Sequence, residues 1–143
     1  MIILIVDGSD SVRETLIRYL GLEKIFNLVF EASTVKEAKR IMNSIKIDLV
    51  LLDIQLPDQS GLAFVNYCNR QTYKPLIIVC SNYGLPQYKN VYEKLAIDQF
   101  FDKSSELPAL KKYINKLVKY KKKYFSSLYT NKRVHKETTR RLK

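Results

Sequence analysis

The sequence predicts an α/β fold, a doubly wound parallel sheet with helices on both faces. Short apolar runs bounded by polar or turn-forming residues recur along the chain, as in strands that are buried on both faces. Segments with apolar residues at helical spacing lie between these runs. The alternation occurs five times, which implies parallel strands joined by right-handed crossovers.

The length of 143 residues and the hydrophobic share of 46% fit one domain with its own core. The apolar run after Met1 is interrupted by Asp7, so it is too short for a signal peptide, and no later run approaches membrane-spanning length. We therefore expect a cytoplasmic protein. Cys68 and Cys80 lack the spacing of metal ligands and are expected to be free thiols.

The net charge of +11 is concentrated near the carboxyl terminus. Residues 1–103 carry 12 Lys and Arg against 12 Asp and Glu, whereas residues 104–143 carry 13 against 2. The basic character therefore concerns the partners of this terminal segment, and not those of the neutral part before it.

The first two strands and helices are predicted from local signals. Residues 2–6 form an apolar run that ends at Asp7, and a capping box of Ser11 and Glu14 begins a helix that stops near Gly21. A second strand is expected at about 27–32. A second helix follows, with Ser33 or Thr34 as its cap and these residues as its apolar face: Val35, Ala38, Ile41 and Met42.

The third strand, residues 49–52, leads directly into Asp53 and then into a loop with Pro57, Asp58 and Gly61. A helix is expected at about 60–69. The fourth strand, 76–80, ends at Ser81, and a less regular helix is expected at 87–96. The last strand, 97–101, runs into Lys103.

Four polar residues follow four different strands: Asp7, Asp53, Ser81 and Lys103. All parallel strands end at the same edge of the sheet, where ligands bind in this class of fold. Two carboxylates suit a divalent cation, while a hydroxyl and an ammonium suit phosphate oxygens. Each residue alone also has an ordinary explanation as a turn, cap or solvated residue, so the hypothesis of a shared phosphoryl site depends on their convergence.

Four segments, LIVDGSDSVRETL, LVLLDIQLPDQSGL, IIVCSNY and FFDKS, resemble the signature segments of bacterial response-regulator receiver domains. The resemblance covers residues 1 to about 120. It implies a flavodoxin-like (βα)5 fold with strand order 2-1-3-4-5. It also implies a phosphoprotein of two-component phosphorelay signalling, which has no enzymatic activity beyond slow autodephosphorylation.

By this resemblance Asp53 is the phosphoacceptor, supplied by a sensor histidine kinase or a phosphotransfer protein. Asp7 corresponds to a metal-binding acid, Lys103 to the family lysine and Ser81 to the switch hydroxyl. Ser81 is preferred to Cys80 because its separation from Lys103 is the usual one and a thiol is a poor donor.

Two further positions match the family pattern. The backbone carbonyl of Gln55 resembles a metal ligand, and Phe100 resembles the switch aromatic residue. Phosphorylation is then expected to alter the surface formed by residues 87–115, which would bind a downstream protein partner or support a dimer.

One position departs from the family pattern, because Gly8 stands where a second adjacent acid is usual. The implied Mg²⁺ should therefore bind more weakly. Asp10 lies nearby and is an alternative ligand, although its position also suits a helix cap.

The carboxyl-terminal segment continues beyond a typical receiver. A last helix is expected after Ser104 or Ser105, with Pro108 in its first turn. We divide the chain into a receiver domain at 1–120 and a basic extension at 121–143, which begins as helix and ends disordered. Three interpretations of the basic segment stay open: a solvated face, contact with nucleic acid, and binding to a protein partner or an anionic membrane surface.

The sequence thus favours a receiver that accepts phosphate on Asp53 and switches protein interactions. Two alternatives remain: a degenerate receiver that binds partners without being phosphorylated, and a small transcriptional regulator that contacts DNA through its basic extension.

Overall fold

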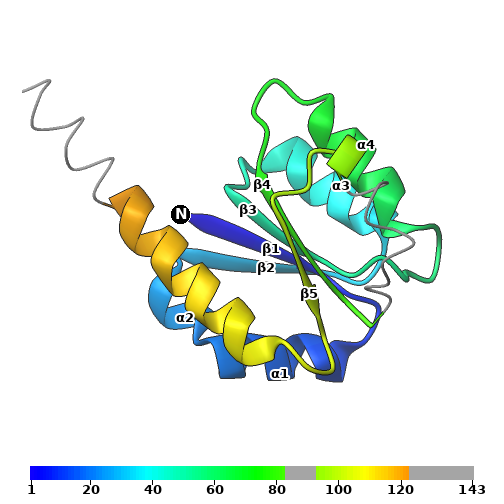
Figure 1. Cartoon of the computed structure of the whole chain (residues 1–143). Coiled ribbons are helices and arrows are strands. Elements are labelled where there is room, and N and C mark those ends of the chain that lie inside the picture. Colours follow the sequence, from blue (N-terminus) through cyan, green and yellow to red (C-terminus); the bar gives the residue numbers. More distant parts are fainter. Residues whose placement is uncertain (83–92, 123–143) are drawn as a thin grey trace, which may run out of the picture. The chain divides into compact units, whose positions relative to one another are not determined.

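The computed structural model describes residues 1–82 and 93–122. Its centre is a five-stranded, wholly parallel sheet in the order β2-β1-β3-β4-β5 (Figure 1). This order confirms the predicted fold class. The strands are β1 (Ile2–Val6), β2 (Leu28–Ala32), β3 (Leu49–Leu52), β4 (Leu76–Ser81) and β5 (Gln99–Asp102).

Helices cover both faces of the sheet. Helices α1 (Asp10–Leu20) and α2 (Leu22–Ile25) lie on one side, and α3 (Val35–Ser44) and α4 (Gly61–Asn69) lie on the other (Figure 1). Residues 107–122 are also helical. The chain divides into two compact units, Met1–Leu110 and Lys111–Lys143.

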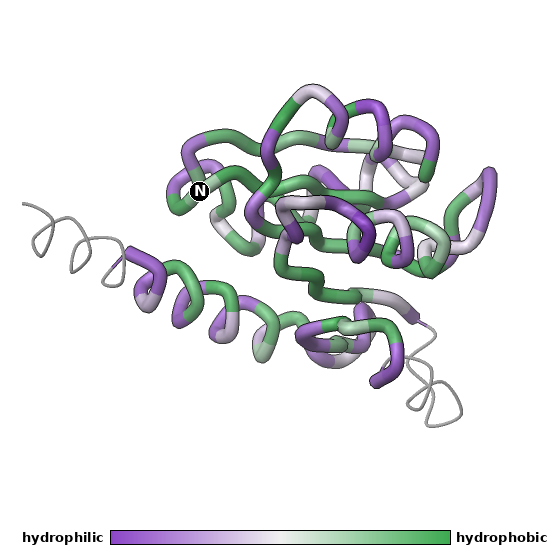
Figure 2. The backbone as a smooth tube through the Cα atoms, turned by 90° about the horizontal axis from the view of Figure 1, so that it is seen from above, coloured by the Kyte–Doolittle hydropathy of each residue, from purple (hydrophilic) through white to green (hydrophobic). Residues whose placement is uncertain are grey.

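The core is formed mainly by the central strands, and Figure 2 shows hydrophobic stretches in the interior of the tube. All four residues of β3 are buried, as are the last four of β1. Among the described residues, the largest side chain that is fully buried is that of Phe64, on α4. Continuous burial on both faces is what a parallel sheet between helical layers requires, so the apolar runs of the sequence have a direct structural cause.

The amino-terminal end of α1 differs from the prediction. Its cap is Ser9, whose hydroxyl accepts a hydrogen bond from the backbone N–H of Val12, and not Ser11. The carboxyl-terminal end is as predicted, because Gly21 adopts φ = 63° and its N–H donates to the last turn. The short helix α2 follows immediately and was not predicted from its four residues.

The starts of α3 and α4 agree more closely with the prediction. Thr34 caps α3 and Ser60 caps α4, each through its side-chain oxygen. The last helix begins at 107, so the predicted caps Ser104 and Ser105 are wrong. The last strand also lies slightly later than expected, at Gln99–Asp102.

The predicted helix at 87–96 lies largely outside the described residues, which resume at 93. Residues 93–94 are helical. Across 1–82 and 93–122, none of the helices combines the length and hydropathy that crossing a bilayer requires. Cys68 and Cys80 are both buried free thiols, as expected.

Candidate functional site

The carboxyl edge of the sheet gathers polar residues from four strands. The last residues of β1 and β3 are paired in the sheet, and so are the last residues of β4 and β5. This register brings together four side chains that are distant in sequence: Asp7, Asp53, Ser81 and Lys103.

The Asp53 carboxylate is held by donors on both oxygens. Its Oδ1 accepts hydrogen bonds from Ser81 Oγ at 2.8 Å and from the backbone N–H of Gln55 at 3.2 Å. Its Oδ2 accepts one from Lys103 Nζ at 2.9 Å. The Asp53 side chain is 14% exposed, so the carboxylate is oriented by the protein and still reachable from solvent.

Lys103 bridges the two carboxylates. Its Nζ lies 2.5 Å from Asp7 Oδ2 in addition to its contact with Asp53. Burial of Lys103 acts to lower its pKa, but the hydrogen bonds and charges of Asp7 and Asp53 outweigh burial and raise the pKa above 10.5. Lys103 is therefore a permanent cation at neutral pH, placed to balance two adjacent negative charges.

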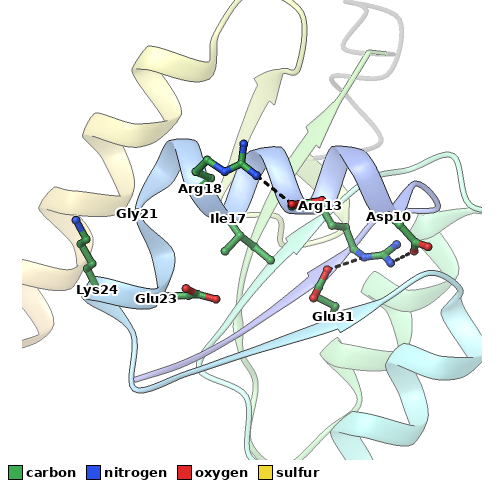
Figure 3. A pocket seen from close by; sticks show the side chains of 9 residues that line it. Asp10, Arg13, Ile17, Arg18, Gly21, Glu23, Lys24 and Glu31 are labelled. Atoms are coloured by element: carbon green, nitrogen blue, oxygen red, sulfur yellow. Dashed lines mark hydrogen bonds and ion pairs between the residues drawn. The ribbon is translucent and has the colours of Figure 1, made fainter.

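Asp7 is anchored by its own loop and by α1. Its Oδ1 accepts a hydrogen bond from the backbone N–H of Ser9 at 2.9 Å, and its backbone carbonyl accepts one from the Arg13 guanidinium. Figure 3 shows this guanidinium between the carboxylates of Asp10 and Glu31, with which it forms ion pairs. The acid at the end of β1 is thus fixed through both its side chain and its backbone.

The oxygen atoms at this site are of the kind that binds a hard cation, but few residues supply them. Asp7 and Asp53 supply carboxylate oxygens, and the Gln55 backbone lies beside Asp53, which is oxygen chemistry that Mg²⁺ accepts. Among the described residues, however, no group of three or more His, Cys, Asp or Glu could hold a metal ion. The Asp10 side chain is 93% exposed and paired with Arg13, so it does not join the other two acids.

Two glycines shape the loops around the site. A Cβ added at Gly8 would meet Pro57 Cδ at 3.2 Å, so a side chain there needs only a small adjustment. A Cβ at Gly61 would lie 2.4 Å from the backbone oxygen of Asp53. The start of α4 therefore packs against the backbone of Asp53 in a way that only glycine permits.

Residues beneath the site are mainly structural. Phe100 is half-buried and packs against the hydrophobic core. Burial raises the pKa of the Cys80 thiol to about 12, an effect that the charge of Lys103 only partly offsets. Cys80 is therefore an unreactive thiol at neutral pH, and the hydroxyl of Ser81 is the group that contacts Asp53.

The sequence analysis did not predict the roles of two residues that support the site, Arg13 and Asp58. Arg13 shares the apolar face of α1 with Leu16 and Leu20, at spacings of three and four residues; an arginine on an apolar face was the available signal. Asp58 was noted only as a loop residue, yet its carboxylate accepts the backbone N–H groups of Val35 and Lys36. No local pattern indicated that contact, which joins segments more than twenty residues apart.

Comparison with known proteins identifies the fold and its family. The model of the response regulator receiver domain matches residues 3–115. The chain therefore belongs to the response regulator receiver domain family, whose members work in two-component signalling.

Individual relatives agree with this assignment. The chain is 31% identical over 115 residues to the sensory transduction protein LytT of Bacillus anthracis. The aligned region covers 78% of this chain and 46% of LytT. It is 35% identical over 99 residues to the aerobic respiration control sensor protein ArcB of Escherichia coli. This aligned region covers 66% of this chain and 12% of ArcB. The chain thus spans less than half the length of these curated relatives.

A solved structure extends the likeness to three dimensions. The response regulator TrrA of Thermotoga maritima, crystallised in complex with Mg²⁺-BeF, is 30% identical and superimposes with a TM-score of 0.68. The match covers 81% of this chain and 97% of TrrA.

Proposed function

We propose that Asp53 accepts a phosphoryl group from a phosphohistidine of a sensor kinase or phosphotransfer protein. The observation that carries the proposal is the convergence of Ser81 Oγ and Lys103 Nζ on the two oxygens of the Asp53 carboxylate. A hydroxyl and an ammonium at these positions are suited to holding phosphoryl oxygens.

The transfer forms a P–O bond to an Asp53 oxygen and breaks the P–N bond of the donor, whose electron pair stays on the imidazole nitrogen as it is protonated. Lys103 balances the negative charge, and Ser81 donates to a phosphoryl oxygen. Asp7, Asp53 and the Gln55 carbonyl would hold Mg²⁺, which supplies further positive charge when bound. Asp10 remains a less favoured ligand because it pairs with Arg13.

The switch that follows uses Ser81 and Phe100. Ser81 is fully buried and bonds to Asp53 in this structure, so transfer of its hydrogen bond to the phosphate changes the packing at the end of β4. Phe100 lies on the neighbouring strand, which pairs with β4. We propose that this change alters the face at 87–115, of which residues 87–92 lie outside the described part, and so controls a downstream partner or a dimer.

Domain organisation is part of the proposal. We assign residues 1–120 to the receiver and 121–143 to a basic extension; the family match to 3–115 supports the first boundary. The extension beyond 122 lies outside the described residues.

We further propose that the protein works in the cytoplasm, where kinases and phosphotransfer proteins meet receivers.

The decisive test is phosphorylation in vitro. Incubation with acetyl phosphate and Mg²⁺ should add one phosphate by intact mass, and Asp53→Asn should abolish the added mass. Asp48→Asn is the matched control, because it makes the same change at the opposite end of β3, where Asp48 accepts the backbone N–H of Ile2, and it should leave the adduct intact. An adduct that survives Asp53→Asn would contradict the assignment.

Gly8 gives a specific reason to consider a second function, a receiver that binds partners without phosphorylation. The described part of the site has two acids rather than a metal cluster. Failure to form any adduct, together with undetectable Mg²⁺ binding, would favour this second function over the first.

A further inference from the structure

A row of lysines lies on the surface of the helix at 107–122. Lys111, Lys112, Lys116, Lys119 and Lys122 are all exposed. From Lys112 onward their spacings are four, three and three residues, which places them on one side of an α-helix at axial intervals of about 4.5–6 Å. Hydrophilic positions recur along this helix in Figure 2. We call these five residues the lysine row.

Little negative charge lies near the lysine row in the sequence. The sequence has no Asp or Glu between Glu106 and Glu137. Within the described residues, no ion pair involves Lys112, Lys116, Lys119 or Lys122. Residues 1–103 carry no net charge, so an external polyanion is the complementary partner.

We propose that the lysine row binds the phosphate backbone of double-stranded DNA without reading its sequence. Lysine ammonium groups are flexible point charges that neutralise phosphates and carry little base specificity. Tyr120 is 69% exposed and follows Lys116 by four residues, so an aromatic ring borders the row. Seven more Lys and Arg in residues 123–143 add to the same charge.

An anionic membrane surface fits the same segment less well. A helix that lies in a bilayer needs an uninterrupted apolar face opposite its basic face. Here Lys121 falls in the helical series of Leu110, Ile114 and Leu117, so a charge interrupts the apolar side. The proposal therefore commits to DNA and leaves vesicle binding as an outcome that would overturn it.

The affinity should depend steeply on salt. If Lys112, Lys116, Lys119 and Lys122 each neutralise one phosphate, log K falls against log salt with a slope of about −3.6. Raising the salt from about 50 to 200 mM should then weaken binding on the order of 10²-fold. Two duplexes of unrelated sequence should bind alike.

The test compares two variants that lose the same charge. One replaces four residues of the lysine row by Gln: Lys112, Lys116, Lys119 and Lys122. The control replaces four exposed lysines of the receiver by Gln: Lys24, Lys36, Lys74 and Lys94. Fluorescence anisotropy with a labelled duplex measures affinity, and circular dichroism checks that both variants stay folded.

The row variant should lose at least about tenfold in affinity and show a shallower salt slope, whereas the control should bind nearly as the unaltered chain does. Equal loss in both variants would show that net charge alone matters and would overturn the proposal. Unchanged binding by a folded row variant would also overturn it. Binding to phosphatidylserine vesicles but not to the duplex would overturn it as well.

This inference does not rest on the proposed phosphoacceptor role. Asp53→Asn should bind the duplex as the unaltered chain does, and the row variant should still form the acetyl phosphate adduct. The two proposals can therefore fail separately, and each experiment identifies which one has failed.

Discussion

Arg13 connects three parts of the receiver through one side chain. Its guanidinium donates to the Asp7 carbonyl and pairs with Glu31 on β2 and with Asp10 at the start of α1. The side chain is only 9% exposed, while its partners Asp10 and Glu31 are 93% and 46% exposed. Its contribution therefore comes mostly from the buried bond to the Asp7 backbone, because solvent screens the two ion pairs.

We expect Arg13→Met to destabilise the fold by about 2 kcal/mol, because the Asp7 carbonyl loses a charged donor. Arg18→Met is the matched control on the same helix. Its ion pair with Glu14 is exposed at both ends, so its loss should cost less than about 0.5 kcal/mol. Urea unfolding measures both, and equal costs would show that Arg13 has no special role.

Gly8 sets the number of acids near Asp53. We expect Gly8→Asp to tighten Mg²⁺ binding by about tenfold or more, because a carboxylate joins Asp7 and Asp53 in a space that needs only a small shift of Pro57. Gly8→Ala adds the same Cβ without the charge and should leave the affinity unchanged. Calorimetric titration with Mg²⁺ measures the difference. A folded Gly8→Asp that gains nothing would show that position 8 does not face the metal.

At the scale of elements, the loop after β3 is tied to the start of α3. The Asp58 carboxylate accepts the N–H groups of Val35 at 3.0 Å and Lys36 at 3.1 Å. Thr34 caps the same helix end through its hydroxyl. The Asp58 carboxylate and the Thr34 hydroxyl thus accept the first N–H groups of α3, and the Asp58 bonds hold the loop after β3 against this helix.

This tie should depend on pH. Desolvation acts to raise the pKa of Asp58, but the backbone hydrogen bonds from Val35 and Lys36 outweigh it and hold the pKa below 3.8. The stabilisation is therefore present above pH 3.8 and is lost as pH falls through the lowered folded-state pKa. Asp58→Ala should lower the free energy of unfolding near neutral pH and have much less effect in acid.

Thr34→Ala provides the control, since it removes a cap of the same helix that does not titrate. Its cost should stay the same across the pH range. Urea unfolding curves at several pH values give both dependences. A cost of Asp58→Ala that does not change with pH would contradict the assignment of its carboxylate.

At the scale of the whole molecule, Lys103 ties the ends of three strands together. It follows β5 and contacts acids that follow β1 and β3. Its pKa is raised above 10.5, so its stabilising contribution is fully present below that pH and is lost as pH rises through the raised value.

We expect Lys103→Met to lower stability by a constant amount from neutral pH to about pH 9, and by a shrinking amount above pH 10.5. Lys74→Met, at an exposed lysine, should have little effect at any pH. Chemical unfolding in matched buffers measures both variants. A constant difference through high pH would mean that Lys103 acts through packing and not through its charge.

Most of the fold followed from the sequence because its signals are local and repeated. Buried apolar runs indicate strands at β1, β3 and β4. The glycine after α1 indicates where that helix ends. The caps were less certain, because Ser9 and Ser11 are both suitable residues in one loop and the choice depends on how the loop leaves β1. Helix α2 has too few residues for a periodic pattern.

The candidate site was predicted in outline and not in its connections. Strand ends placed Asp7, Asp53, Ser81 and Lys103 at one edge, since parallel strands leave no other arrangement. The sequence carried no signal for which oxygen of Asp53 each donor contacts. It also left the partner of Asp10 open, because the position of Arg13 depends on how α1 packs against β2.

Gly61 has a practical consequence for anyone who maps this protein by mutation. A side chain at this position would collide with the backbone of Asp53, so nearly every substitution should disable the receiver although residue 61 carries no functional group. In a screen that scores activity alone, Gly61 would look like a residue that takes part in the reaction. Measuring folding beside activity separates a residue that reacts from one that simply leaves room.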